Sequence, residues 1–321
     1  MTEYDQGYKQ LFSHARMVED LLRGFVAGEW LEQLDFDTLD RVNATFVSPE
    51  YQKREGDIIW RIQSQAHGGE IYIYLLLEFQ STVDEEMALR MLVYVGMLYQ
   101  EIVKNRRPQE TRLLPPVLPL VLYNGKKLWN AAHALSQRIA QAPLQIREYQ
   151  PEMRYLLIDE SRLLDSDLAV ERNLAAAMFS IECSRTPQDF ENAIGLLIKW
   201  LGLGVSEAQN ASLQKAFLTW LRRVVLPAKF PDIAFGDIEE LQEVKKMLKD
   251  QTTGWTYEWK RQGMIQRSRD DIVDILMTRF DAAPQDITSI LHKIEDDTYL
   301  KTLHHQAITV KSVDDFRQLL G

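Results

Sequence analysis

Three side chains with oxygen atoms suited to metal binding lie at the ends of two neighbouring apolar segments. Glu78 and Gln80 close the run EIYIYLLLEFQS, residues 70–81, and Asp57 opens the segment GDIIWRI, residues 56–62. Side chains alternate across a strand, so Glu78 and Gln80 share one face. Polar groups at the end of a buried strand cost desolvation free energy unless a ligand or a metal meets them. These residues therefore predict a binding site.

The chemistry that suits these residues is that of a divalent cation. Mg²⁺ takes oxygen ligands, commonly one or two carboxylates, and leaves other positions for water and a substrate phosphate. Asp57 and Glu78 would bind the metal, and Gln80 would supply a further oxygen or orient the attacking water. The bound ion would polarise a phosphoryl oxygen and lower the pKa of its water, as phosphodiester hydrolysis requires. The structural alternative is that Asp57 starts a strand and that Glu78 and Gln80 cap a sheet edge.

The two apolar segments must form a hairpin if these side chains are to meet. The turn residues His67, Gly68 and Gly69 separate the two segments, which favours an antiparallel pair of strands. Asp57 begins one arm and Glu78 ends the other, so both would lie at the open end of the hairpin. This shared position favours the metal site over three unrelated structural roles.

The remaining patterns predict a helical and strand framework around this hairpin. Three turn-forming residues, Pro227, Pro231 and Gly236, mark a boundary, so we expect one domain over residues 1–230 and a small helical domain over residues 231–321. The expected elements are a helical segment over 5–30, an acidic connection over 34–40, strands over 42–47, 56–62, 70–77, 113–123 and 154–159, a helix over 84–104, and helices from about 174 onward.

The quoted segments, together with YKQLFS, ALRMLVY and LPLVLYNG, resemble a known family. The order helix, three strands, helix, strand, with Asp on the second strand and Glu-x-Gln closing the third, is similar to the PD-(D/E)XK nuclease superfamily. The segments resemble more closely the Rpn family of recombination-promoting nucleases, also labelled YhgA-like transposases, over about the first half of the chain. The resemblance implies an α/β fold with a restriction-endonuclease-like core, to which the helical patterns of the rest of the chain add helices and a small helical C-terminal domain.

By this resemblance Asp57 and Glu78 would bind Mg²⁺ or another divalent cation, and Gln80 would occupy the position where many superfamily members carry lysine. Glu19, in the first helical segment, matches a supporting acid of some members. The chain departs from the family pattern at Phe79, Tyr4 and Asn124, each of which replaces an expected histidine. A neutral amide at Gln80 cannot stabilise developing negative charge as an ammonium would, so slow turnover or a second metal would follow.

The composition of the chain limits the binding partners and the cellular location that we expect for the protein. The net charge of −10 excludes a protein that coats nucleic acid nonspecifically, because phosphate contacts need many Lys and Arg residues. The single cysteine, Cys183, excludes an internal disulfide, and no apolar run reaches the roughly 18 residues of a membrane helix, so we expect a cytoplasmic protein that does not enter a membrane. Five basic residues follow two elements whose ends we expect to lie near each other. They form a hypothetical DNA path, with a solvated surface as the alternative: Lys104, Arg106, Arg107, Lys126 and Lys127.

These features predict a Mg²⁺-dependent DNA endonuclease that promotes recombination or DNA mobility. The alternative is a catalytically weak or inactive nuclease-like fold that binds DNA or protein, which the amide of Gln80 and the net charge of −10 favour. A double-strand break needs two sites of this kind or two visits, so a symmetric homodimer is the simplest assembly for the enzyme.

Overall fold

The computed structural model describes 3–42, 57–65, 69–78, 83–107, 113–125, 127–141, 143–163, 171–201, 203, 207–230, 238–250, 252–280, 285–294 and 296–320. The chain divides into two compact units. One comprises Met1–Cys183 with Ala193–Glu243, and the other comprises Ser184–Asn192 with Val244–Gly321. A separate domain that begins near residue 231 stays a prediction.

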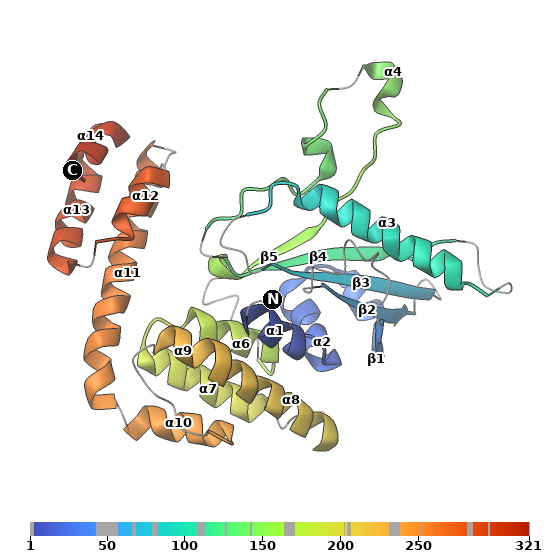
Figure 1. Ribbon diagram of the computed structural model, residues 1–321, viewed down its shortest axis with the longest axis horizontal. Helices are drawn as coiled ribbons and strands as arrows, with labels where there is room; N and C mark the ends of the chain where they lie inside the picture. The colour runs from blue at the N-terminus through green and yellow to red at the C-terminus, as the bar shows by residue number, and fades with distance from the viewer. Residues whose placement is uncertain are drawn as a thin grey trace. The chain divides into compact units, whose positions relative to one another are not determined.

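A mixed five-stranded sheet forms the centre of the first unit (Figure 1). The strands lie in the order β1-β2-β3-β4-β5, with the first three antiparallel and the last three parallel. The expected mixed α/β class is therefore confirmed. The strands are β1 (Leu34–Val42), β2 (Asp57–Ser64), β3 (Gly69–Glu78), β4 (Val117–Tyr123) and β5 (Leu156–Asp159).

The hairpin of β2 and β3 is confirmed, and its register is continuous from Asp57 paired with Leu76 to Ser64 paired with Gly69. Both arms are rich in β-branched, aromatic and aliphatic residues, which favour a strand buried on its two faces. On β2, Ile58 and Ile59 point to opposite faces and are both buried. The hairpin thus forms the interior of the sheet.

The position predicted for the first strand, residues 42–47, was wrong, because the first strand begins at Leu34. The segment expected to be an acidic connection is β1 itself, in which Leu34 and Phe36 are buried and Asp37 is exposed. Charged residues suit this position because β1 lies at the edge of the sheet, with one side open to solvent. Most of the strand expected over 42–47 falls outside the described residues.

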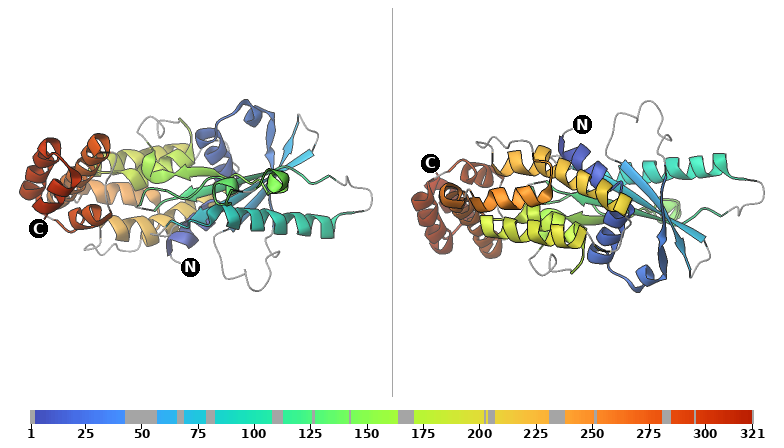
Figure 2. Two further views of the ribbon diagram at one scale, coloured as in Figure 1. Left: turned by 90° about the horizontal axis from the view of Figure 1, so that it is seen from above. Right: turned by 90° about the horizontal axis from the view of Figure 1, so that it is seen from below.

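One long helix, α3 (Met87–Asn105), carries the chain back from the end of β3 to the start of β4. It packs on one face of the sheet, where Met91 and Tyr94 join Ile59 and Tyr123 in a buried cluster. We call this side of the sheet the α3 face. Figure 2 shows the sheet from the α3 face and from the opposite side.

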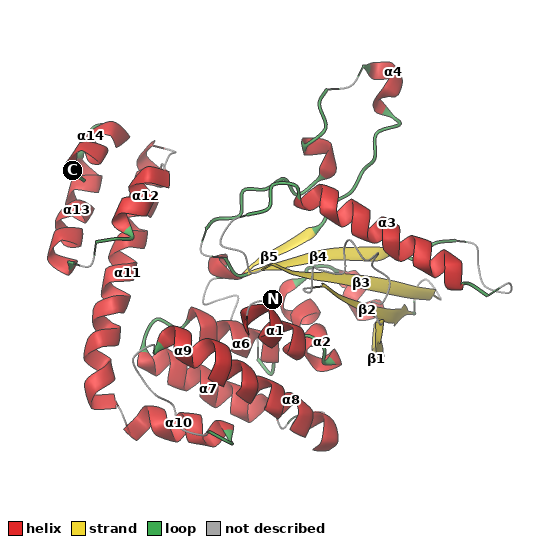
Figure 3. Ribbon diagram, viewed as in Figure 1, coloured by secondary structure: helices red, strands yellow, loops and turns green. Residues whose placement is uncertain are grey.

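The opposite face is covered by α1 (Glu3–Leu11), α2 (Ala15–Phe25) and α6 (Leu174–Cys183) (Figure 3). The single helical segment expected over 5–30 is in fact two helices, interrupted at 12–14. The Trp60 indole donates a hydrogen bond of 3.1 Å to the Phe12 carbonyl at this interruption. The first helices are thereby joined to β2 by a buried polar contact as well as by apolar packing.

Further helices and short helical turns lie outside the sheet and the helices that cover it. Those of the first unit include α8 (Glu207–Trp220), a π-helical turn η4 (Leu221–Val225) and α9 (Leu226–Lys229), which run on without a break. Pro227 lacks the N–H that an α-helical bond would need, which accounts for the π turn before it. The other elements are η1 (Glu29–Gln33), η2 (Leu135–Gln137), α4 (Leu144–Arg147), η3 (Glu160–Arg162), α7 (Pro187–Leu201) and α10 (Leu241–Asp250).

The second unit has its own apolar core. Leu276, Leu291, Leu303 and Phe316 are buried together, one from each of its four C-terminal helices. Within the described residues, no helix combines the length and the hydropathy that crossing a membrane would require. The four helices are α11 (Thr252–Phe280), α12 (Gln285–Leu291), α13 (Asp297–Thr309) and α14 (Val313–Leu319).

Candidate active site

The backbone register places Asp57 and Glu78 close together at the end of the hairpin. Asp57 pairs with Leu76, and Glu78 lies two residues further along β3 on the same face of the sheet. Diagonal neighbours of this kind have Cβ atoms about 7–8 Å apart. Two carboxylates can reach one cation over that separation, so the backbone fits the expected pair of ligands.

The side-chain chemistry of this pair stays a prediction. The side chains of Asp57 and Glu78 lie outside the described part of the structure, as do all atoms of Gln80 and Phe79. Among the side chains that are described, no group of three or more His, Cys, Asp or Glu residues could hold a metal ion. The side chains of Asp57 and Glu78 are not among these, and a metal site at the two acids stays a prediction.

A further carboxylate, which sequence reasoning missed, lies in the same row of the sheet. Glu78 pairs with Tyr123 on β4, and Tyr123 pairs with Asp159 on β5. Tyr123 separates the two acids and donates a hydrogen bond of 2.8 Å to the Lys127 carbonyl. Asp159 is 9% exposed and lies 3.6 Å from the guanidinium of Arg162. On the backbone it is two strand spacings, or about 10 Å, from Glu78, with Tyr123 on the strand between them.

A second polar cluster is buried on the opposite face, at the same ends of β4 and β5. Tyr8 on α1 donates a hydrogen bond of 2.9 Å to Glu160 Oε2. The Asn124 amide lies 3.0 Å from the Tyr8 hydroxyl and 2.8 Å from Glu182 Oε2 on α6. The Lys229 ammonium donates to the Glu182 carbonyl at 2.9 Å. We call Glu160 and Glu182 the carboxyl pair.

Burial perturbs the ionisation of the carboxyl pair. The pKa of Glu182 rises to about 7, chiefly because burial disfavours the charged form, although Tyr8 and Lys229 oppose the rise. The pKa of Glu160 is raised well above its ordinary value by burial and then by the charge of Glu182. The Tyr8 hydroxyl also has a raised pKa, again chiefly through burial. The pair therefore holds at least one proton near neutral pH.

Sequence reasoning singled out Glu19 on α2, but its neighbour Asp20 is the buried acid. Glu19 pairs with exposed Arg23 of the same helix, at 2.9 Å. Asp20 is 4% exposed and accepts bonds from Arg16 Nε at 2.9 Å and from the Leu174 backbone N–H at 2.6 Å. Burial raises the pKa of Asp20, and its two partners oppose that rise. Asp20 joins α2 to the start of α6, and a supporting role for Glu19 stays a prediction.

The basic residues expected to lie near each other are at opposite ends of β4, so that expectation is wrong. Lys104 ends α3, and Arg106 donates to the Leu113 carbonyl before β4 begins. Lys127 follows the other end of β4, seven residues or about 20 Å away. The separation arises because β3 and β4 are parallel, so α3 must return the chain across the sheet. Lys126 lies outside the described residues, and contacts of Arg107 and the other basic residues with DNA stay a prediction.

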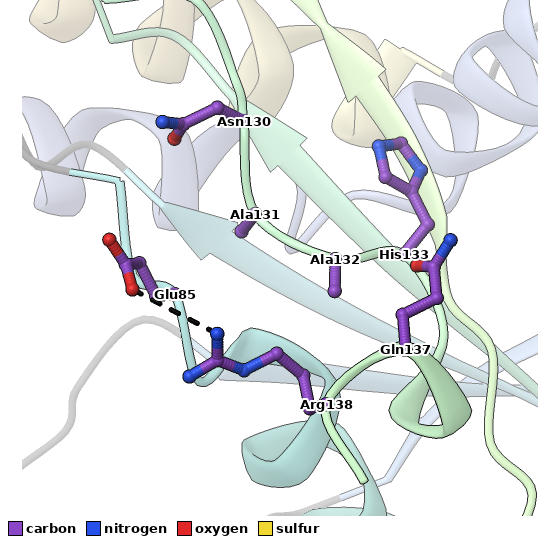
Figure 4. Close-up of a pocket in the computed structure, with 7 residues that line it drawn as sticks. All are labelled: Glu85, Asn130, Ala131, Ala132, His133, Gln137 and Arg138. Carbon is purple, nitrogen blue, oxygen red and sulfur yellow. Dashed lines mark ion pairs between the residues drawn. The ribbon is translucent and has the colours of Figure 1, made fainter. Parts of the chain in front are cut away.

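A polar pocket of about 460 Å³ opens on the α3 face (Figure 4). Glu85, just before α3, lines one side together with Arg138, and their side chains come within 4.0 Å. His133 and Gln137 lie across from this ion pair, and Asn130 and two alanines complete the lining.

The wall behind this pocket is built of aromatic side chains. The His133 ring is stacked on Tyr155, with centroids 5.5 Å apart and planes 11° apart. The Tyr155 hydroxyl accepts a hydrogen bond of 3.0 Å from the Trp129 indole, which in turn contacts the Tyr123 ring at 4.8 Å. Burial raises the pKa of Tyr155 to about 12, so its hydroxyl stays protonated. This chain of contacts links the pocket to the sheet row that contains Glu78.

The mixed five-stranded sheet, covered by helices on both faces, defines an α/β protein with acidic positions at the ends of its central strands. The chain belongs to the family described as "Putative transposase, YhgA-like", whose model matches residues 2–211. The resemblance to the Rpn family of YhgA-like proteins is therefore confirmed. No solved structure matches the chain.

Several curated relatives carry nuclease names. The chain is 29% identical over 128 residues to the recombination-promoting nuclease RpnD of Escherichia coli O157:H7, covering 39% of this chain and 46% of the relative. It is 27% identical over 126 residues to RpnC of E. coli strain K12, covering 39% of this chain and 40% of the relative. The chain thus spans less than half the length of these relatives. A third relative in strain K12, named "Putative inactive recombination-promoting nuclease-like protein YjiP", is 29% identical over 93 residues, or 29% of this chain and 88% of that protein.

Proposed function

We propose that the chain is a metal-dependent DNA endonuclease with a PD-(D/E)XK-type core that promotes recombination. The observation that carries this proposal is the register of the hairpin, which puts Asp57 and Glu78 at diagonal positions on one face of the sheet. Nuclease names among the relatives support the choice of DNA as substrate.

In this proposal Asp57 and Glu78 bind Mg²⁺ or another divalent cation. The ion, when bound, supplies charge that polarises the phosphoryl oxygen and acidifies water. Gln80 orients the attacking water through its amide, without the positive charge of an ammonium. The apolar cluster on the α3 face holds β2, β3 and β4 in register, which keeps the two acids in place.

A nicking assay on supercoiled plasmid tests this proposal. Asp57→Asn should reduce Mg²⁺-dependent nicking by at least about a hundredfold, because one of two ligands is lost. Asp37→Asn is the matched control, since Asp37 is an exposed aspartate on β1. Equal nicking by the wild type and Asp57→Asn would refute the proposed site.

The second candidate is a catalytically weak or inactive module that binds DNA or protein. Two observations favour it: Gln80 stands where many superfamily members carry lysine, and one relative is named as inactive. Under this alternative, wild-type protein shows no Mg²⁺-dependent nicking but still binds DNA or a protein partner. The same plasmid assay, with binding measured in parallel, distinguishes the two functions.

A further inference from the structure

The polar pocket on the α3 face contains none of the residues of the proposed metal site. It lies on the same face as the Asp57 and Glu78 positions, and contacts through Tyr155 and Trp129 link it to Tyr123, which pairs with Glu78 in the sheet. A volume of about 460 Å³ is within the usual range for small-ligand pockets and is large enough to admit a nucleobase.

The aromatic wall of the pocket offers a surface for stacking. His133 is exposed, and Tyr155 covers one face of its ring in a nearly parallel stack. The Trp129 indole holds Tyr155 through a hydrogen bond, so the stack is supported from behind. Bases of single-stranded nucleic acid stack on aromatic side chains held in this way.

The charges in the pocket favour a neutral base over a phosphate group. Arg138 is already paired with Glu86 and lies 4.0 Å from Glu85, so two carboxylates face one guanidinium. The excess negative charge repels phosphate. The Glu85 side chain is 71% exposed, which leaves its oxygen atoms accessible to a hydrogen-bond donor.

We propose that this pocket is a subsite for an unpaired nucleobase that carries an exocyclic amino group. The base stacks on His133 and donates from its amino group to Glu85, and the amides of Asn130 and Gln137 contact its edge. Cytosine has such an amino group, whereas thymine presents an oxygen at the same position. The inference rests on the proposed function, since it takes DNA as the substrate and adds that one of its nucleotides is unpaired at the pocket.

Binding of fluorescein-labelled oligo(dC) and oligo(dT), each of 12 nucleotides, tests this subsite by fluorescence anisotropy. EDTA in the buffer prevents cleavage. The wild type should bind oligo(dC) more tightly than oligo(dT). His133→Ala should weaken binding of both by at least about fivefold, because each stacked base contributes appreciably to affinity. His292→Ala is the matched control, since His292 is exposed on the second unit and should leave both affinities unchanged.

Glu85→Ala gives a readout that a merely structural role would not change. Removal of the negative charge should raise the affinity for both oligonucleotides, while the preference for oligo(dC) disappears. Three outcomes would overturn the subsite. The wild type could bind the two oligonucleotides equally, it could bind neither, or His133→Ala could leave both affinities unchanged. Plasmid nicking that stays intact in that case would leave the nuclease proposal standing. A clear oligo(dC) preference without any nicking would refute the nuclease and keep the subsite.

Discussion

Replacing Glu182 with glutamine tests whether the carboxyl pair binds a proton at neutral pH. The pKa of Glu182 in the folded protein is about 7, against an ordinary value of 4.5 that we take for the unfolded chain. The folded state therefore binds this proton more tightly than the unfolded state. Its contribution to stability is full below about pH 4.5 and is lost as the pH rises through about 7.

The size of the effect follows from this difference in pKa. A rise of about 2.5 in pKa corresponds to about 3 kcal/mol in the free energy of unfolding, of which about 2 kcal/mol is lost between pH 5.5 and pH 8.5. For a domain of this size that is a change of roughly 4–8 °C in Tm. Glutamine is neutral throughout, and its oxygen can still accept the hydrogen bond from Asn124. The Tm of Glu182→Gln relative to wild type should therefore rise by that amount as the pH rises.

Thermal unfolding followed by circular dichroism, at constant ionic strength from pH 5.5 to pH 8.5, measures this difference. Glu152→Gln is the matched control, because Glu152 is exposed, and its curve should run parallel to that of the wild type. Tyr8→Phe provides a second variant. The Tyr8 hydroxyl lowers the pKa of both members of the carboxyl pair, so its loss should extend the fall in stability to higher pH. Parallel curves for wild type, Glu182→Gln and Tyr8→Phe would refute the reasoning.

Four further outcomes are expected. Mg²⁺ should raise the Tm of the wild type by relieving repulsion between carboxylates, and Asp57→Asn should lose most of that rise; an unchanged rise would place the cation elsewhere. Glu78→Ala should reduce plasmid nicking by orders of magnitude while DNA affinity is kept or increased, and Gln80→Lys should keep or increase nicking; equal nicking by all three proteins would exclude the nuclease. Asp20→Ala should lower the free energy of unfolding by roughly 1.5–3 kcal/mol in denaturant titrations, since a charged acceptor is lost; an unchanged midpoint would contradict its role at α6. Sedimentation of the active protein should show a dimer, and double-strand cutting by a species of only 37.3 kDa would disprove that assembly.

The elements predicted correctly are those with a strong local pattern. The apolar runs of β2, β3 and β4 and the helical spacing in α3 each depend on neighbours within one segment, so their types could be predicted from the sequence. β1 was missed because its aspartates resemble a loop, although Leu34 and Phe36 alternate with them as in an edge strand. The prediction of a connection at residues 34–40 gave more weight to the charged residues than to the alternation of apolar residues.

The sequence by itself determined the hairpin and the presence of acids at its open end, since side-chain alternation and turn residues act over a few positions. It also carried the motifs that assign the family. It could not determine that Tyr8, Asn124, Glu160 and Glu182 meet in one buried cluster, because these residues come from four elements far apart in the chain.

Only the tertiary structure decided which polar groups lost water and which sides of the sheet they occupy. Glu19 and Asp20 are adjacent in sequence, yet packing of α2 on α6 buries one and leaves the other partly exposed. The parallel connection through α3 likewise separates Lys104 from Lys127 by the full length of β4. Burial and long-range proximity arise from the packing of whole elements, whereas periodicity reports only the neighbours of each residue along the chain.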